Sequence, residues 1–79
     1  LYNGQDDLDL LRALNNLGII LFKLKRYKDA LEQNEEALKV AKQLYKGQDH
    51  PDVLRSLRNM GLTLCKLKRY KEALKLEEE

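Results

Sequence analysis

The chain has 79 residues and a formal net charge of +2, with 43% hydrophobic and 35% charged residues. A length of this order folds one small domain and leaves little room for an enzyme with a deep substrate pocket. No apolar run approaches the roughly 18 residues that span a bilayer, so we expect no membrane partner. The single cysteine, Cys65, cannot form an internal disulfide, which favours a cytoplasmic protein.

The first predicted helix follows the Asp-rich stretch QDDLD, in which an aspartate can cap free backbone N–H groups. Asp9 is expected near the positive end of the helix dipole. Leucines spaced by four and three residues share one face of this helix, namely Leu10, Leu14, Leu17, Leu21 and Leu24. Gly18 lies in the middle, where glycine costs about 1 kcal/mol relative to alanine. We expect it to permit a close approach of the next helix, with Ala30 as the opposite wall.

The second helix is predicted to begin near Tyr27 and to end before Gly47, since glycine tolerates the left-handed conformation that closes helices. Helical spacing places one set of residues on its buried side: Ala30, Leu31, Asn34, Ala37, Leu38, Ala41 and Leu44.

The third helix is predicted after QDHPD, where Pro51 suits a first helical turn and Asp52 suits the positive end of the dipole. Its apolar face consists of Val53, Leu57, Met60, Leu64 and Leu67. Gly61 and Ala73 are expected to repeat the contact of Gly18 with Ala30. His50 is interpreted as a turn residue and Cys65 as a small apolar substitute for Phe22.

The hexamer KLKRYK occurs from Lys23 to Lys28 and again from Lys66 to Lys71. It joins the two helices of each pair, and its positive charges oppose the negative end of a helix dipole. Leu24 and Leu67 are expected to face the core. The basic residues are therefore explained by architecture, although they also motivate an RNA-binding alternative, which would show as binding that weakens steeply with salt.

A shift of 43 residues lays Leu1–Glu36 onto Leu44–Glu79 with 22 of 36 pairs identical. A repeat of this length predicts an all-α solenoid of antiparallel helix pairs. We assign residues 1–43 to a first unit, with a tail of a preceding unit at its start, and residues 44–79 to a second unit that is truncated in its second helix. The prediction is a fragment with three full helices and a partial fourth. A coiled coil is the competing interpretation of the leucine spacing, but three glycines and Pro51 interrupt any long heptad run.

The repeated pattern resembles the tetratricopeptide repeat, and in particular a longer variant of about 42 residues that is found in kinesin light chains. The residues that carry the resemblance are Leu14, Leu17, Gly18, Leu21, Tyr27, Ala30 and Ala37 in the first unit and Leu57, Met60, Gly61, Leu64, Tyr70 and Ala73 in the second. The sequence HPDV from His50 to Val53 is typical of the same variant. Two departures are the replacement of the usual second-helix aromatic by Asn34 and Glu77 and the lack of tryptophan.

The resemblance implies a scaffold that binds a protein or peptide in a concave groove lined by the first helix of each unit. The corresponding groove positions are Arg12, Asn15, Asn16, Ile19, Phe22 and Lys23, then Arg55, Arg58, Asn59, Leu62, Cys65 and Lys66. Asn16 and Asn59 can bond to a peptide backbone, and Arg12 and Arg55 can bind a carboxylate, so an acidic partner is expected. The alternative is that these residues are simply solvated polar residues of an exposed helix face without a ligand.

Self-association is a second expected function, because a solenoid of two units leaves apolar end surfaces open to stacking or to exchange of a helix. Catalysis has little support, since His50 and Cys65 are distant in sequence and no phosphate loop or metal-ligand spacing occurs. No cofactor and no metal are implied.

Overall fold

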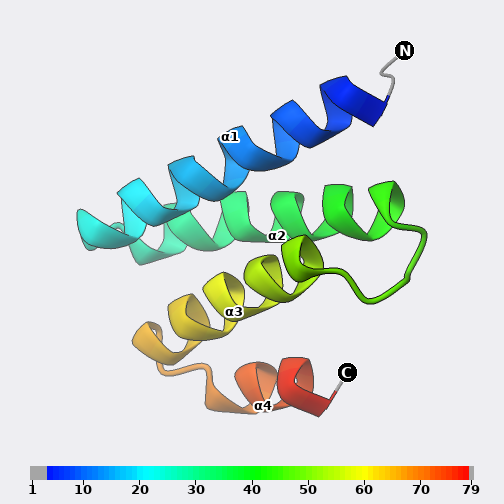
Figure 1. Ribbon diagram of the computed structural model, residues 1–79. Coiled ribbons are helices and arrows are strands. Elements are labelled where there is room, and N and C mark those ends of the chain that lie inside the picture. Colours follow the sequence, from blue (N-terminus) through cyan, green and yellow to red (C-terminus); the bar gives the residue numbers. More distant parts are fainter. Residues whose placement is uncertain (1–3, 79) are drawn as a thin grey trace.

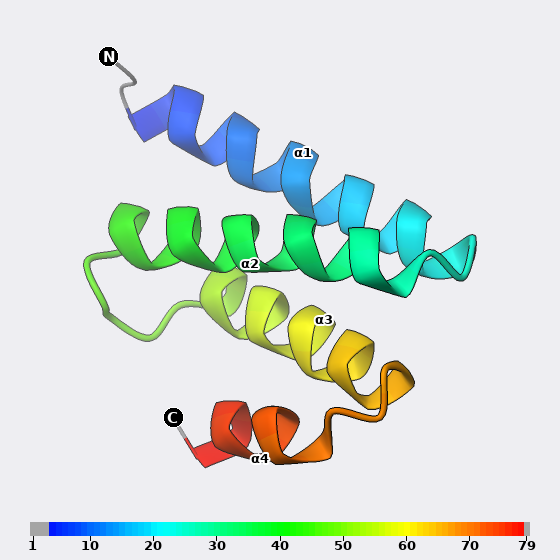
Figure 2. The same ribbon diagram turned by 180° about the vertical axis from the view of Figure 1, so that it is seen from behind.

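The computed structural model describes the backbone of residues 4–78 and the side chains of residues 6–76. It contains four helices, α1 (Gly4–Lys23), α2 (Tyr27–Leu44), α3 (Pro51–Lys66) and α4 (Tyr70–Glu78). Each helix packs against the next in the chain, and α3 also touches α1 (Figure 1). The view from behind shows the same succession, with each helix running back along the preceding one (Figure 2). The predicted all-helical architecture is confirmed.

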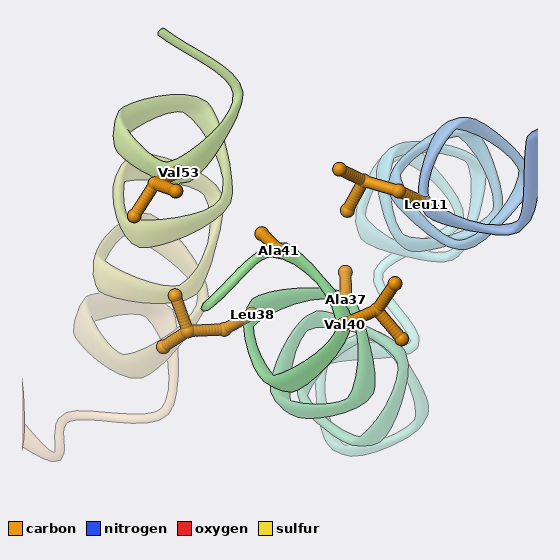
Figure 3. Close-up of a cluster of buried hydrophobic side chains, with 6 residues drawn as sticks. All are labelled: Leu11, Ala37, Leu38, Val40, Ala41 and Val53. Atoms are coloured by element: carbon orange, nitrogen blue, oxygen red, sulfur yellow. The ribbon is translucent and has the colours of Figure 1, made fainter. Parts of the chain in front are cut away.

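The second helix matches its prediction closely. Six of the seven residues expected on its inner side are buried and Leu44 is half-buried. Two clusters use this side. One joins Leu11 of α1 to Ala37, Leu38, Val40 and Ala41 of α2 and to Val53 of α3. Figure 3 shows Leu11 and Val53 on the two helices that flank α2, so that α2 is covered on both sides. The other cluster joins Leu31 of α2 to Leu64 of α3 and Ala73 of α4.

The leucine face predicted for the first helix is only partly correct. Leu21 is buried and Leu14 half-buried, but Leu17 is 42% exposed and Leu24 is 62% exposed, and Leu10 is also exposed. The helix turns a different side to α2, formed by Leu11, Asn15, Gly18 and Leu21. The expectation that Leu24 faces the core was therefore wrong. Its counterpart Leu67 does pack against the second cluster, because α3 has a neighbour on the side where α1 has none among the described residues.

The starts of α1 and α3 differ in a way that the repeat did not predict. Pro51 is the first residue of α3, and His50 before it is extended and caps the helix by accepting a hydrogen bond at Nδ1 from the Asp52 N–H, 3.1 Å away. The cap is thus a histidine rather than an aspartate. The first unit has Leu8 where Pro51 stands, and α1 already begins at Gly4, which places Asp9 in the second helical turn. The expected tail of a preceding unit, Leu1–Asn3, lies outside the described residues.

Lysines close three of the helices in left-handed conformations that usually favour glycine. Lys25, Lys46 and Lys68 have φ of 62°, 53° and 61°. After α1 the Lys25 N–H bonds to the Phe22 carbonyl and the Arg26 N–H to the Leu21 carbonyl, and Lys68 and Arg69 repeat this pattern after α3. These paired bonds form the Schellman motif that satisfies free carbonyls at a helix end. Gly47, predicted to stop the second helix, has φ of 76° just beyond Lys46.

Each hexamer therefore contains the end of one helix and the start of the next: α1 and α2 in the first unit, α3 and α4 in the second. Arg26 pairs with Asp29 at 2.7 Å, and Arg69 pairs with Glu72 through two hydrogen bonds, in each case across the first turn of the following helix. The Arg69 guanidinium lowers the pKa of the Glu72 carboxyl through these bonds. The single arginine of each hexamer is thus already paired within the chain.

Candidate functional site

The twelve predicted groove positions lie on α1 and α3, the two helices that flank α2. Between these helices is a hollow of about 170 Å³, which we call the groove hollow. Its lining residues are Gly18, Ile19, Phe22, Lys23, Asn34, Asn59, Leu62 and Thr63. Five of the predicted positions are among them: Ile19, Phe22, Lys23, Asn59 and Leu62. The structure therefore brings part of the predicted set together around one concavity.

The floor of the groove hollow is polar and depends on Asn34, which belongs to α2 and was not among the predicted site residues. Asn34 is 1% exposed. Its Nδ2 donates to Thr63 Oγ1 at 2.8 Å and to the Asn59 carbonyl at 3.3 Å. The Thr63 hydroxyl donates to the same carbonyl at 2.9 Å, so it can only accept from Asn34. The two bonds from Asn34 Nδ2 therefore orient the amide nitrogen of Asn34 toward α3.

Two carboxamide atoms at this floor have no hydrogen-bond partner in the described part of the chain, Asn34 Oδ1 and Asn59 Nδ2. Asn34 Oδ1 packs against the backbone of α1 at Gly18, where a β-carbon would lie only 2.4 Å from it. The close helix approach predicted for Gly18 is thus present, but Asn34 forms the opposite wall and the Ala30 carbonyl is more distant, at 3.9 Å. The sequence signal was available, because Asn34 stands where the family pattern has an aromatic residue.

Gly61 does not repeat this contact. No described atom lies within 4 Å of the position that its β-carbon would occupy, so the expected wall at Ala73 is absent. The repeat counterpart of Asn34 is Glu77, whose side chain lies outside the described residues.

Asn15 is the predicted groove residue that the structure places elsewhere. It is 6% exposed, and its Oδ1 accepts a hydrogen bond from Ser56 Oγ at 3.3 Å. This bond joins α1 to α3 beneath the surface, so Asn15 holds the two units together and is not available to a ligand. An asparagine and a serine 41 positions apart can be paired only once the packing of the helices is known.

The cations predicted for the groove are exposed, with one qualification. Arg12, Lys23, Arg58 and Lys66 are exposed to solvent. Arg55 is exposed as well, but it pairs with Asp52 at 3.1 Å within α3. Asp52 also accepts a hydrogen bond from the Tyr45 hydroxyl at 2.5 Å, and this bond, together with burial, raises the pKa of Tyr45. The Tyr45 ring stacks on His50 with centroids 3.7 Å apart, which explains the histidine as part of a structural joint.

The remaining predicted positions differ in accessibility. Asn16 and Cys65 are exposed, and Cys65 is a free thiol. Asn59 is half-buried with its Nδ2 shielded from solvent. Phe22 packs edge-to-face on Tyr27 with ring centroids 5.3 Å apart. Tyr70 has Cys65 in place of such a ring neighbour and is 59% exposed.

A second hollow, of about 330 Å³, opens on the far side of α3. Gly61, Leu62 and Cys65 of α3 and Tyr70, Ala73 and Leu74 of α4 line it together with Arg58. Gly61, Leu62 and Cys65 are the repeat counterparts of Gly18, Ile19 and Phe22 in the groove hollow, but no further helix of the described chain closes this second hollow. We call this surface the end seat.

Within the described residues, no three His, Cys, Asp or Glu side chains lie close enough together to hold a metal ion. Nor is any described helix long and apolar enough to cross a membrane.

These features define a helical repeat protein in which antiparallel pairs stack side by side and form a shallow concavity between their first helices. A family model described as tetratricopeptide repeat matches residues 4–79. The chain belongs to the tetratricopeptide repeat family, whose members are in general non-catalytic scaffolds that mediate protein–protein interaction. No curated protein and no solved structure gave a significant match to the chain.

Proposed function

We propose that this chain is a protein-interaction module that binds an acidic peptide segment across the face formed by α1 and α3. The observation that carries the proposal is the groove hollow. Ile19 and Phe22 from α1 and Leu62 from α3 give it apolar walls, and Leu62 is half exposed without a ligand. A hollow of about 170 Å³ is the size of one apolar side chain rather than of a substrate with many polar groups.

The charge of the surrounding face supports an acidic partner. Lys23 borders the hollow, and Arg12, Arg58 and Lys66 are exposed on the same two helices. Arginine can hold a carboxylate through two parallel hydrogen bonds, and a group of cations also speeds the approach of an acidic chain. Arg55 contributes less, because it would have to exchange Asp52 for the ligand.

Asn16 is the best candidate for contact with a peptide backbone. It is exposed and lies one helical turn after Arg12, and its carboxamide can both donate and accept. Asn59 would need to rotate its buried Nδ2 outward before it could do the same. We therefore assign the backbone contact to Asn16.

The unit itself is proposed to be the longer, kinesin-light-chain-like form of the repeat, divided into residues 1–43 and 44–79. The offset of 43 residues and the HPDV sequence support this proposal. In the structure His50 caps α3 and Pro51 is its first residue.

The test is selection from a phage-displayed library of random linear peptides, with the chain as bait. We expect enrichment of acidic peptides that carry a large apolar residue. Their binding should be lost in Ile19→Glu/Leu62→Glu and weakened in Lys23→Ala, whereas Lys39→Ala, at an exposed position of α2, should bind as the unchanged chain does. Peptides that bind the Ile19→Glu/Leu62→Glu variant equally well would exclude the hollow as the binding site.

We propose self-association as a second function. Large hydrophobic side chains are exposed at both ends of the succession of helices, with Ile20 at 54% on α1 and Leu74 at 59% on α4. Sedimentation that shows a monomer at every accessible concentration would remove this proposal and leave the peptide-binding proposal unaffected.

A further inference from the structure

Two turns of the chain carry most of its positive charge. They are residues 23–29, between α1 and α2, and residues 66–72, between α3 and α4, and we call them the two tips. Eight of the 15 lysines and arginines lie in the tips, together with only two of the 13 acidic residues. The tips therefore have a formal charge of +6, and the rest of the chain has −4. Both tips lie at the same end of the helices, opposite the α2–α3 linker, and form a surface that we call the basic edge (Figure 1 and Figure 2).

Packing of one unit on another does not cover the basic edge. The first tip has a following unit in the chain, and the second tip has a preceding unit. The same cations are nevertheless exposed in both tips, namely Lys25, Arg26 and Lys28 and their counterparts Lys68, Arg69 and Lys71. A neighbouring unit on either side thus leaves a tip open to solvent, so the exposure of the basic edge does not depend on where the units begin and end.

The arginines and the lysines of the basic edge differ in their partners. Each arginine is paired with the acidic residue of its own tip. Four lysines form no ion pair and no side-chain hydrogen bond with another described residue, and we call them the edge lysines: Lys25, Lys28, Lys68 and Lys71. A single exposed ion pair contributes little to binding. A partner that supplies several negative charges along one line is therefore the kind of partner that four such lysines can bind.

The second tip adds an aromatic surface to this charge. Tyr70 is 59% exposed and borders a hollow of about 390 Å³ whose lining residues all belong to the tip. The ring of Tyr27 in the first tip is instead half-buried and packs edge-to-face on Phe22. The difference arises within the unit, because Cys65 stands at the position of Phe22. An exposed ring among cations is a surface on which a nucleobase can stack while neighbouring phosphates contact lysines.

We infer that the basic edge binds single-stranded nucleic acid, with the phosphates on the edge lysines and a base stacked on Tyr70. A phosphodiester chain carries one negative charge per nucleotide, and every base has a face for stacking, so this partner matches both the charge and the ring. The surface is separate from the groove hollow, and none of the edge lysines is among the predicted groove positions. The inference therefore goes beyond the peptide-binding proposal and can fail without it.

The tips fit an anionic membrane less well. A protein that lies on a membrane inserts apolar side chains between the headgroups in addition to its cations. Leu24 of the first tip is exposed, but its counterpart Leu67 packs against the second cluster of the core. The two tips thus share their lysines but share no apolar side chain that could enter a bilayer.

The experiment measures binding of the chain to a fluorescein-labelled oligouridylate by fluorescence anisotropy. The edge variant replaces the four edge lysines by glutamine: Lys25→Gln/Lys28→Gln/Lys68→Gln/Lys71→Gln. The control variant replaces the four lysines outside the tips, all of them exposed: Lys39→Gln/Lys42→Gln/Lys46→Gln/Lys75→Gln. Both variants lose the same charge, so any difference between them reports the position of the charge. Circular dichroism spectra show whether each variant keeps its helices.

We expect the unchanged chain to bind the oligouridylate about 50-fold more weakly at about 200 mM than at about 50 mM salt, as four phosphate contacts on a single strand predict. The control variant should bind within about threefold of the unchanged chain. The edge variant should bind more than about tenfold more weakly at about 50 mM salt and depend less on salt. Tyr70→Leu should weaken binding about fivefold or more without changing the salt dependence, whereas Tyr70→Phe retains the ring and should bind normally.

Three results would overturn the inference. The first is no binding of the oligouridylate at about 50 mM salt, and the second is an equal loss in the edge and control variants. The third is binding to phosphatidylserine vesicles without binding to the oligouridylate, which would identify a membrane surface instead. Equal affinities of Tyr70→Leu and Tyr70→Phe would refute the stacked base. All of these results leave the peptide-binding proposal unaffected, because it depends on the groove hollow.

Discussion

The two mid-helix glycines predict opposite responses to the same substitution. Alanine gains about 1 kcal/mol over glycine in a helix interior. At Gly61 no described atom lies within 4 Å of the new methyl group, so Gly61→Ala should raise the free energy of unfolding by up to about 1 kcal/mol. At Gly18 the methyl group would lie 2.4 Å from Asn34 Oδ1, far inside contact distance.

Asn34 cannot move aside without loss, because it is 1% exposed and its Nδ2 is held by Thr63 and the Asn59 carbonyl. Displacing it breaks buried hydrogen bonds, at about 1–3 kcal/mol, which exceeds the gain in helix propensity. Since about 1 kcal/mol of this loss is offset by helix propensity, we expect Gly18→Ala to lower the free energy of unfolding by up to about 2 kcal/mol, or the melting temperature by up to roughly 16 °C for a domain of this size.

The assay is urea unfolding followed by circular dichroism at low protein concentration, with a double-mutant cycle between positions 18 and 34. Asn34→Ala removes the obstacle, so Gly18→Ala should become stabilising in that background. Stabilisation by Gly18→Ala with Asn34 present, or an equal effect in both backgrounds, would contradict this prediction.

Three further predictions concern other local contacts. Lys25→Gly should raise the free energy of unfolding by about 0.5–1 kcal/mol, because a side chain costs about 1–2 kcal/mol in the left-handed conformation and the larger unfolded-state entropy of glycine offsets part of the gain. The control Lys28→Gly, on the first turn of α2, should lower the free energy of unfolding. Equal effects of the two substitutions in urea unfolding would contradict the explanation. The hydrogen bond to Asp52 raises the pKa of Tyr45 above its ordinary value of 10.0, so its stabilisation is complete below that pH and is lost as the pH rises through the folded-state pKa. The chain should therefore lose stability above about pH 10 more steeply than Tyr45→Phe does, and parallel alkaline melting curves would count against this. Thr63→Ile should cost about 1–3 kcal/mol, because it removes the acceptor of Asn34 Nδ2, whereas Thr63→Ser should retain most of the stability; similar urea midpoints for the two variants would show that the hydroxyl is not needed.

Helical periodicity predicted which residues share a face but could not say which faces meet a neighbour. For α2 the distinction matters less, because helices flank it on both sides. Six of its seven buried residues were predicted, and Val40 was missed. For α1 they differ: Leu17 and Leu24 are as apolar as Leu21, yet they are exposed because no described part of the chain packs on that side. The amino-acid types at these positions do not contain that information.

The candidate site shows a similar division. Ile19, Phe22 and Leu62 were placed on a common concavity because the resemblance to the family implied it, and they do line the groove hollow. Asn15 was assigned to the same face but is buried against Ser56. Asn34 was predicted to lie on the buried side of α2 and to depart from the family pattern, but not to line the site. Its partners Thr63 and Asn59 lie 29 and 25 positions away and are brought to it by packing. Polar pairs between units depend on tertiary register, which local spacing does not encode.

The hydrogen bonds between the two units also determine which unit can come first in the chain. Thr63 and Ser56 of the second unit are hydrogen-bonded to Asn34 and Asn15 of the first unit. The first unit itself has Ile20 and Ala13 at the positions of Thr63 and Ser56. A recombinant chain that carried the first unit twice would set an isoleucine against the Asn34 donor and an alanine against Asn15. Despite 22 identities in 36 aligned positions, the units are therefore not interchangeable. A duplicated first unit would need substitutions at these positions before it could form the same hydrogen bonds with its neighbour.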